Sequence, residues 1–169
     1  MVNEEIRKQN KELCEKYPFL IPSNRWSGKK ITTTEKGFWP GNLDKIPEYN
    51  YEYTELDSMP DGWRKAFGLK LCEELKKELQ KHNMLETYRI TQIKEKYGSL
   101  RWYDTGNTDK GYKIIYKYSN LSAKTCIHCG NKAAKITKDW ISPYCDYCIP
   151  KDSPYIIIEE YEKEMEEEN

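Results

Sequence analysis

CIHCG at residues 126–130 and CDYC at residues 145–148 are the two stretches on which the fold of this chain depends. Their cysteines follow the spacing C-x2-C-x15-C-x2-C, which lies in the range of zinc sites built from four thiolates. In each C-x2-C turn two sulfurs converge on one point, and two such turns complete a tetrahedron with about 2.3 Å per Zn–S bond. Gly130, directly after the second sulfur, suits the tight turn with positive φ that such a loop needs. The sequence therefore predicts a Zn²⁺ site whose ligands are Cys126, Cys129, Cys145 and Cys148.

The composition of the 169 residues indicates one small domain with a modest core. Charged residues make up 33% and hydrophobic residues 37%, and the core must draw on 14 Tyr, 5 Trp and 3 Phe. No apolar run approaches the roughly 18 residues of a membrane span, and the first residues do not resemble a signal peptide. Cys14 and Cys72, outside the zinc spacing, fall in helical patterns, where a thiol packs as a small apolar group. We therefore expect a reducing compartment and a cytoplasmic protein that does not bind membranes.

The charges cancel over the whole chain but are unevenly distributed. Residues 159–169 carry seven Glu and one Lys, a net charge of −6. The remainder has 27 basic and 21 acidic residues, a net charge of +6. This body is mildly basic and falls short of the basic stripe of a dedicated nucleic-acid-binding protein.

The first third of the chain is predicted to hold one helix and one long loop. Apolar residues recur at helical spacing up to Tyr17, Asn3 is placed to cap this helix, and Pro18 ends it. Residues 23–44 are rich in Gly, Pro, Ser and Thr and are predicted to form a loop. A loop of this length needs large side chains to hold it on the body. The expected anchors are Trp26, Phe38 and Trp39.

Two further patterns follow this loop. Alternation over residues 49–56 predicts a strand with Tyr49, Tyr51 and Tyr53 on one face, which we expect to pack on the core. An aromatic platform for a planar ligand is the alternative. Residues 60–82 form the clearest amphipathic helix, because apolar side chains return every fourth residue. These are Trp63, Phe67, Leu71, Leu75 and Leu79.

The second half of the chain predicts a hairpin, two helices and the ribbon. Residues 87–96 and 100–104 read as two strands around a turn at 97–99, with Leu100 and Trp102 on one face. A loop over 105–111 leads to a short helix over 114–121, and a last helix starts at Ile156.

The expected fold is therefore α+β, with a small antiparallel sheet packed on an amphipathic helix and a zinc-ribbon-like element toward the C-terminus. Its parts are an α+β body over 1–121, a zinc ribbon over 122–150, and a helix with an acidic tail over 151–169.

The hairpin combines cations with aromatic rings, which together can hold a phosphate and a stacked base. The candidate ligand-binding residues are Lys94, Lys96, Tyr97, Arg101, Trp102 and Tyr103. The alternative is an amphipathic hairpin whose charged face is merely solvated.

We find no signature of an enzyme in the sequence. His82 and His128 are the only histidines, and neither stands beside a nucleophile motif or a glycine-rich phosphate loop. Four thiolates around zinc leave no open position for a catalytic water. A pair of carboxylates stays open as an alternative, because acidic residues are too numerous for the sequence to select one.

Several stretches together resemble a known family: residues 17–20, 53–67 and 71–72, then QIKEKYGSLR at 92–101, and the paired C-x2-C. In this order they are similar to a widespread family of small bacterial, prophage and phage proteins, most of them uncharacterised. The similarity covers roughly residues 15–150. Tyr97 stands where the family often has Phe, and the acidic tail after Glu159 is not shared. The resemblance implies a role in host takeover or defence evasion, in the host cytoplasm if the protein is phage-encoded.

Three functions follow as hypotheses. The first is a non-enzymatic, zinc-stabilised binding protein that sequesters a small anionic ligand, such as a signalling nucleotide, as an anti-defence protein. The second is a nucleic-acid-binding regulator that uses the ribbon lysines Lys124, Lys132, Lys135 and Lys138. The third is a protein–protein inhibitor of a host factor, docking through the loop aromatic residues or the acidic tail.

Overall fold

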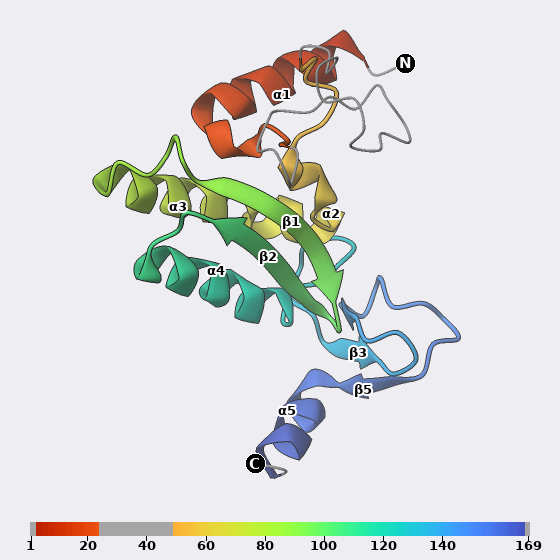
Figure 1. The fold of residues 1–169 in the computed structure, drawn as a ribbon. Helices are drawn as coiled ribbons and strands as arrows, with labels where there is room; N and C mark the ends of the chain where they lie inside the picture. Colours follow the sequence, from red (N-terminus) through yellow and green to blue (C-terminus); the bar gives the residue numbers. More distant parts are fainter. Residues whose placement is uncertain (1–2, 24–48, 168–169) are drawn as a thin grey trace, which may run out of the picture.

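The computed structural model describes residues 3–23 and 49–167 and has an α+β fold. In chain order its elements are α1 (Glu4–Lys16), η1 (Pro18–Leu20), η3 (Glu55–Ser58), α2 (Asp61–Trp63), η4 (Arg64–Gly68), α3 (Leu69–Lys81), β1 (Arg89–Lys96), β2 (Ser99–Thr105), α4 (Asp109–Ser122), β3 (Lys135–Thr137), β4 (Pro143–Tyr144), β5 (Tyr155–Ile157) and α5 (Ile158–Glu167). The hairpin β1–β2 lies in the middle with α3 and α4, while α1 and α5 lie at opposite ends (Figure 1). Within the described residues, no helix is long and apolar enough to cross a membrane.

The first helix begins and ends where the sequence predicts. The Asn3 side chain accepts a hydrogen bond from the backbone N–H of Glu5 (3.1 Å), and Pro18 starts η1 instead of extending α1. The Tyr17 hydroxyl donates to the Glu73 carboxylate (2.9 Å), which ties the end of α1 to α3. The predicted loop lies outside the described residues from residue 24 onward, and so do its expected anchors Trp26, Phe38 and Trp39.

The predicted strand over residues 49–56 is wrong. Tyr51 has a φ of 60°, which breaks an extended chain, and η3 begins at Glu55. The Asp57 carboxylate accepts a hydrogen bond from the Thr54 backbone N–H (2.7 Å) and thereby stabilises this turn. Tyr49 is buried, and its ring centroid lies 4.6 Å from that of Tyr51. The Tyr49 ring therefore packs into the core, as expected, but from a coil and not from a sheet.

The long amphipathic helix is present as the continuous run α2, η4 and α3. All five residues predicted to face the core are at most 2% exposed: Trp63, Phe67, Leu71, Leu75 and Leu79. A spacing of four residues drifts by about 40° per step on a helix of 3.6 residues per turn. The structure inserts the wider π-helical turn η4 between Trp63 and Leu69, and this turn reduces the drift where Trp63 and Phe67 must share one face.

The hairpin is present with a two-residue turn, since β1 ends at Lys96 and β2 starts at Ser99. Its core face carries Ile93 and Trp102 as cross-strand neighbours, and α4 packs against β2 and α3 (Figure 1). The helix α4 starts at Asp109, five residues earlier than predicted.

The early start of α4 has a local cause. The Thr108 hydroxyl accepts a hydrogen bond from the Gly111 backbone N–H (2.9 Å) and caps the helix. An N-cap threonine satisfies one of the backbone donors that a first helical turn leaves free. The predicted loop over 105–111 is therefore confined to residues 106–108.

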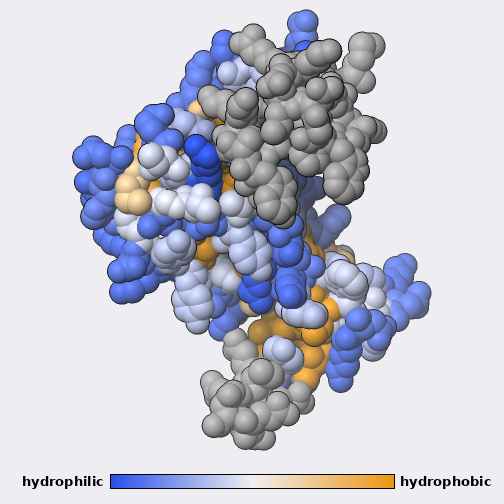
Figure 2. Space-filling view, viewed as in Figure 1, coloured by the Kyte–Doolittle hydropathy of each residue, from blue (hydrophilic) through white to orange (hydrophobic). Residues whose placement is uncertain are grey.

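The C-terminal part is built on a three-stranded antiparallel sheet in the order β4–β3–β5. Ile156 and Ile157 lie in β5 and not in the last helix, which starts at Ile158. A second small core joins Ala133 and Ile136 to Ile158. Figure 2 shows hydrophobic residues gathered over this region. The ribbon sheet thus extends past residue 150, where the sequence placed its end.

Two glycines bring the ribbon into direct backbone contact with the body. The Gly62 N–H donates to the Ile127 carbonyl (3.0 Å), and the Trp63 indole N–H donates to the Thr125 carbonyl (2.8 Å). A Cβ on Gly62 would lie 2.3 Å from the Cys126 carbonyl oxygen. A Cβ on Gly130, which has a φ of +84°, would lie 2.5 Å from the Gly62 carbonyl oxygen. The loop CIHCG is therefore seated on the start of the central helical segment.

This contact predicts that Gly62→Ala destabilises the protein by about 2 kcal/mol, because the added methyl has only backbone to displace. Gly68→Ala is the matched control on the same helical run. Its Cβ would meet nothing closer than a Leu56 methyl at 3.4 Å, and alanine favours the helix by about 0.5–1 kcal/mol. Urea denaturation measures both. Equal free energies of unfolding for the two variants would contradict the close backbone contact between Gly62 and the loop CIHCG.

Candidate functional site

The four predicted zinc ligands come together as one cluster. Their Sγ atoms all lie within 4.8 Å of one another, and the sulfurs of Cys129 and Cys145 are 3.6 Å apart. A tetrahedron with Zn–S bonds of about 2.3 Å has edges of about 3.8 Å, whereas a disulfide needs about 2.05 Å. The spacing therefore fits a metal ion bound by four thiolates and not a disulfide. Among the described residues, no other group of three or more His, Cys, Asp or Glu side chains is placed to hold a metal.

Backbone hydrogen bonds position the two C-x2-C turns. The Gly130 N–H donates to the Cys126 carbonyl (3.0 Å), which closes the first turn. The Cys148 N–H donates to the Cys145 carbonyl (3.2 Å), which closes the second. The Ile127 N–H donates to the Pro143 carbonyl (2.9 Å) and links the two turns. The sulfurs are thus held by main chain, with Cys126 and Cys145 buried and the other two half-buried.

The thiols of the cluster differ in their pKa values. Burial acts to raise the pKa of the Cys126 thiol, but the backbone N–H groups of Cys129, Cys145 and His128 lower it to about 7. Hydrogen bonding to Cys145, followed by burial, raises the pKa of the Cys148 thiol to about 12. A soft divalent cation would stabilise all four as thiolates. The cluster can therefore hold a metal ion, and its four sulfurs fill a tetrahedral shell.

The hairpin gathers five of its six candidate ligand-binding residues. Lys94 and Arg101 are cross-strand neighbours, so their side chains project from the same face. The Lys94 ammonium lies 5.5 Å from the centroid of the Tyr103 ring on this face, and the Lys96 ammonium lies 5.3 Å from the Tyr97 ring. Within residues 3–23 and 49–167, none of the three cations forms an ion pair with a carboxylate. We call this surface, made by Lys94, Lys96, Tyr97, Arg101 and Tyr103, the hairpin face.

Trp102 is separated from the other five. It is the cross-strand neighbour of Ile93 and points into the core, where it is 6% exposed. Its indole N–H donates to the Tyr88 hydroxyl (2.8 Å), which in turn donates to the Asp104 carboxylate (2.7 Å). Because side chains alternate along a strand, a ligand on the hairpin face does not reach the Trp102 ring.

A hollow of about 410 Å³ lies where the hairpin turn meets the ribbon. It is lined from the hairpin by Glu95, Lys96 and Tyr97 and from the ribbon by Lys138, Asp139, Trp140 and Ile141. We call it the turn pocket. The sequence analysis named Lys96 and Tyr97 but missed the ribbon side. The available signal was a tryptophan in the polar segment KDW at 138–140, and its Trp140 side chain is 74% exposed.

Two of the ribbon lysines, Lys135 and Lys138, have different surroundings. Lys135 lies 3.0 Å from the Asp146 carboxylate and 4.4 Å from the centroid of the Tyr155 ring, and hydrogen bonding to Asp146 raises its pKa. Lys138 lines the turn pocket. Of the two histidines, His82 lies 3.1 Å from the Glu78 carboxylate at the end of α3, and His128 is exposed.

Fold and site together define an α+β protein with a four-cysteine, zinc-ribbon-like element seated on its central helix. Comparisons with family models, with curated proteins and with solved structures find no match for this chain.

The cysteine cluster predicts that Cys126→Ser or Cys145→Ser loses the bound metal and at least about 4 kcal/mol of stability, because metal binding is coupled to folding. Elemental analysis of purified protein and urea denaturation measure the two effects. Cys14→Ser is the control, since Cys14 is equally buried but lies outside the cluster, and it should keep its metal. Wild-type protein that carries well under one metal ion per chain would overturn the assignment.

Proposed function

We propose that this chain is a non-enzymatic, zinc-stabilised binding protein of the phage and prophage type, which sequesters a small anionic ligand such as a signalling nucleotide. The observation that carries the proposal is the hairpin face. Three cations share it with two exposed tyrosines, and no carboxylate among the described residues neutralises them.

The chemistry of the hairpin face suits an anion with a planar group. The Arg101 guanidinium can hold a phosphate through two hydrogen bonds, and Lys94 and Lys96 supply ammonium donors along the adjacent strand. Charge-assisted hydrogen bonds of this kind contribute about 1.5–3 kcal/mol each. The exposed rings of Tyr97 and Tyr103 offer apolar contact beside these cations.

Zinc has a structural role in this proposal. Four cysteine thiolates complete its coordination shell, so no position stays open for a water or a substrate. The metal instead holds the loop CIHCG in the shape that fits Gly62. We therefore assign the cysteines to the scaffold and the binding to the hairpin.

The nucleic-acid alternative has weaker support. Lys135, one of the four ribbon lysines on which it depends, is already paired with Asp146. The body carries a net charge of only +6, against −6 in residues 159–169. The protein–protein alternative depends either on the acidic tail or on Trp26, Phe38 and Trp39, which lie outside the described residues. A small ligand is the class that the described surface fits best.

The biological setting is an extension of the resemblance noted in the sequence. A phage-type protein that holds a nucleotide signal without converting it would lower the free concentration of that signal in the host cytoplasm. Such a role needs affinity and abundance but no catalytic group, which agrees with a closed metal site and a binding surface built from cations and rings.

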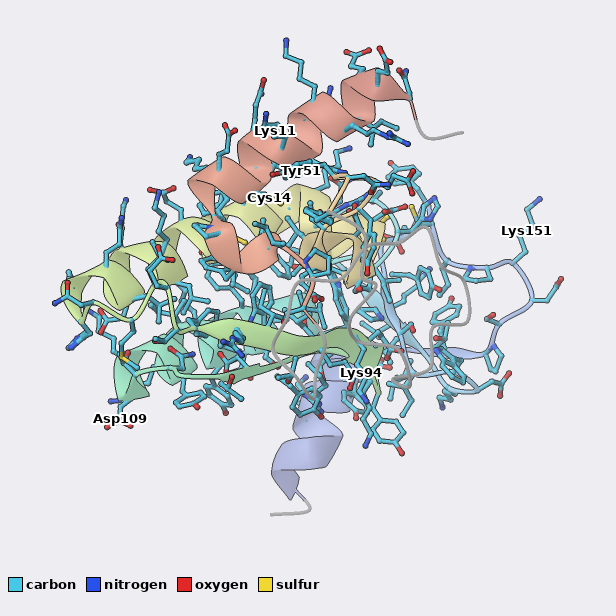
Figure 3. All side chains as sticks on the ribbon, turned by 45° about the horizontal axis from the view of Figure 1, so that its top comes forward. Lys11, Cys14, Tyr51, Lys94, Asp109 and Lys151 are labelled. Atoms are coloured by element: carbon cyan, nitrogen blue, oxygen red, sulfur yellow. The ribbon has the colours of Figure 1, made fainter. Side chains whose placement is uncertain are left out.

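The proposal predicts that the double variant Lys94→Ala/Arg101→Ala binds a nucleotide at least about tenfold more weakly than wild type, because two phosphate contacts are lost. Isothermal titration with GMP, AMP, cyclic GMP, cyclic di-GMP and inorganic pyrophosphate measures this. Lys11→Ala and Lys151→Ala are charge-matched controls, since Lys11 lies on α1 and Lys151 on the loop between β4 and β5, away from Lys94 (Figure 3).

Wild-type protein that binds none of these probes, and from which denaturation releases no small molecule, would reject the proposed function. Gel shifts with DNA and RNA test the alternative. Binding of a duplex with a steep dependence on salt would favour the nucleic-acid function instead.

A further inference from the structure

The turn pocket has two walls from distant parts of the chain, and both are held in place. On the hairpin side, a Cβ on Gly98 would lie 3.2 Å from a methyl carbon of Ile141 and 3.3 Å from its carbonyl oxygen. The hairpin turn is therefore packed directly on the ribbon. The Gly98 N–H also donates to the Glu95 carboxylate (2.7 Å), which closes the turn from within. The pocket does not depend on a ligand to bring its walls together.

The ribbon wall is a closed loop. The Thr137 N–H donates to the Ser142 carbonyl (3.1 Å), and the Ser142 N–H donates to the Thr137 hydroxyl (3.2 Å). The same hydroxyl hydrogen-bonds to the Trp140 carbonyl. Residues 138–141 are thereby fixed at both ends, yet the Trp140 ring itself is 74% exposed. A large apolar ring held out on a fixed loop is available for contact with a ligand.

Tyr97 is in an unfavourable backbone conformation for its residue type. It has a φ of 51° and is followed by Gly98 with a φ of 73°, so both turn residues have positive φ. Turns of this kind favour Asn-Gly or Asp-Gly, and a bulky residue with positive φ is strained. The Tyr97 side chain is 71% exposed and so gains little from burial. Apart from the Lys96 ammonium near its ring, the local structure thus gives no reason for a tyrosine here, whereas a binding role does.

The remaining lining residues match the parts of a nucleotide. Lys96 and Lys138 supply two cations to the lining. Asp139 forms no ion pair among the described residues, so its carboxylate can accept hydrogen bonds from the N–H groups of a base. No ring contact joins Tyr97 to Trp140 within the described part of the chain. A volume of about 410 Å³ lies in the range of about 300–1,000 Å³ of small-molecule sites.

We propose that the turn pocket is a nucleobase site, in which the base stacks on Tyr97 and Trp140 while its phosphate reaches Lys96 and the hairpin face. This inference rests on the proposed function. The hairpin face would bind the phosphate of the nucleotide, and the turn pocket would bind its base. Lys96 belongs to both surfaces, and Lys94 lies two residues before it on the same face of β1, about 7 Å along a strand. A nucleotide can therefore span from the pocket to the cations.

Three variants test the site. Tyr97→Asn keeps positive φ at lower strain, so the melting temperature should stay unchanged or rise while the affinity for GMP falls about tenfold. Trp140→Ala should lower GMP affinity by a similar factor and remove the change in tryptophan fluorescence on binding. Each loss corresponds to one stacking contact of a base on a ring. Tyr116→Ala is the control, because Tyr116 is 68% exposed on α4 and lies outside the pocket. It should bind GMP like wild type.

A ligand pair separates this inference from the proposed function. GMP carries the base and ribose 5-phosphate lacks it, so wild type should bind GMP at least about tenfold more tightly. If both bind equally, or if Tyr97→Asn and Trp140→Ala bind GMP as Tyr116→Ala does, the base site is wrong and the anion-binding function stands. If neither GMP, ribose 5-phosphate nor pyrophosphate binds wild type, the proposed function fails and this inference fails with it.

Discussion

The contact between Gly62 and the loop CIHCG is the constraint on which the rest of the structure depends. Two backbones approach so closely that neither Gly62 nor Gly130 can carry a side chain without displacing main-chain atoms. Trp63 reinforces the contact through its indole N–H and is itself fully buried. The loop can only present this backbone surface if its shape is fixed, and four thiolates on one metal ion would fix it. The cysteines therefore act on the body through the backbone they hold, and not through their own side chains.

This arrangement explains how a small metal site can shape a surface at some distance from it. The ribbon that starts on the central helix returns to the body a second time, where Ile141 packs on the hairpin turn at Gly98. In the sequence β3 lies between these two contacts and β4 follows shortly after Ile141, so the ribbon touches the body on both sides of β3. The turn pocket lies at the second contact. The shape of the pocket therefore depends on how the ribbon packs on the hairpin turn.

The sequence predicted the features that depend on local spacing. The metal ligands follow from a fixed pattern of cysteines, and the buried face of the central helix follows from apolar residues at every fourth position. The predictions from the sequence were wrong where the local structure is determined by an unusual backbone conformation or by contact with a distant segment of the chain. Alternation over 49–56 carries no sign of the positive φ at Tyr51, and Ile156 and Ile157 form a strand because the edge of β3 is there to pair with them. The turn pocket was missed for the second reason, since its walls come from segments about forty residues apart.

Hydrogen exchange with and without a chelator tests most directly whether the metal-held loop organises the body. The central claim predicts that metal removal exposes the amides of residues 126–148 and also those of Gly62 and the hairpin turn at 97–99, while the buried core of α3 stays protected. The Gly62 amide is the most informative, because its acceptor is the Ile127 carbonyl between two of the cysteines. Faster exchange confined to residues 126–148, with Gly62 and the turn unchanged, would show that the ribbon is an independent appendage and would contradict this account.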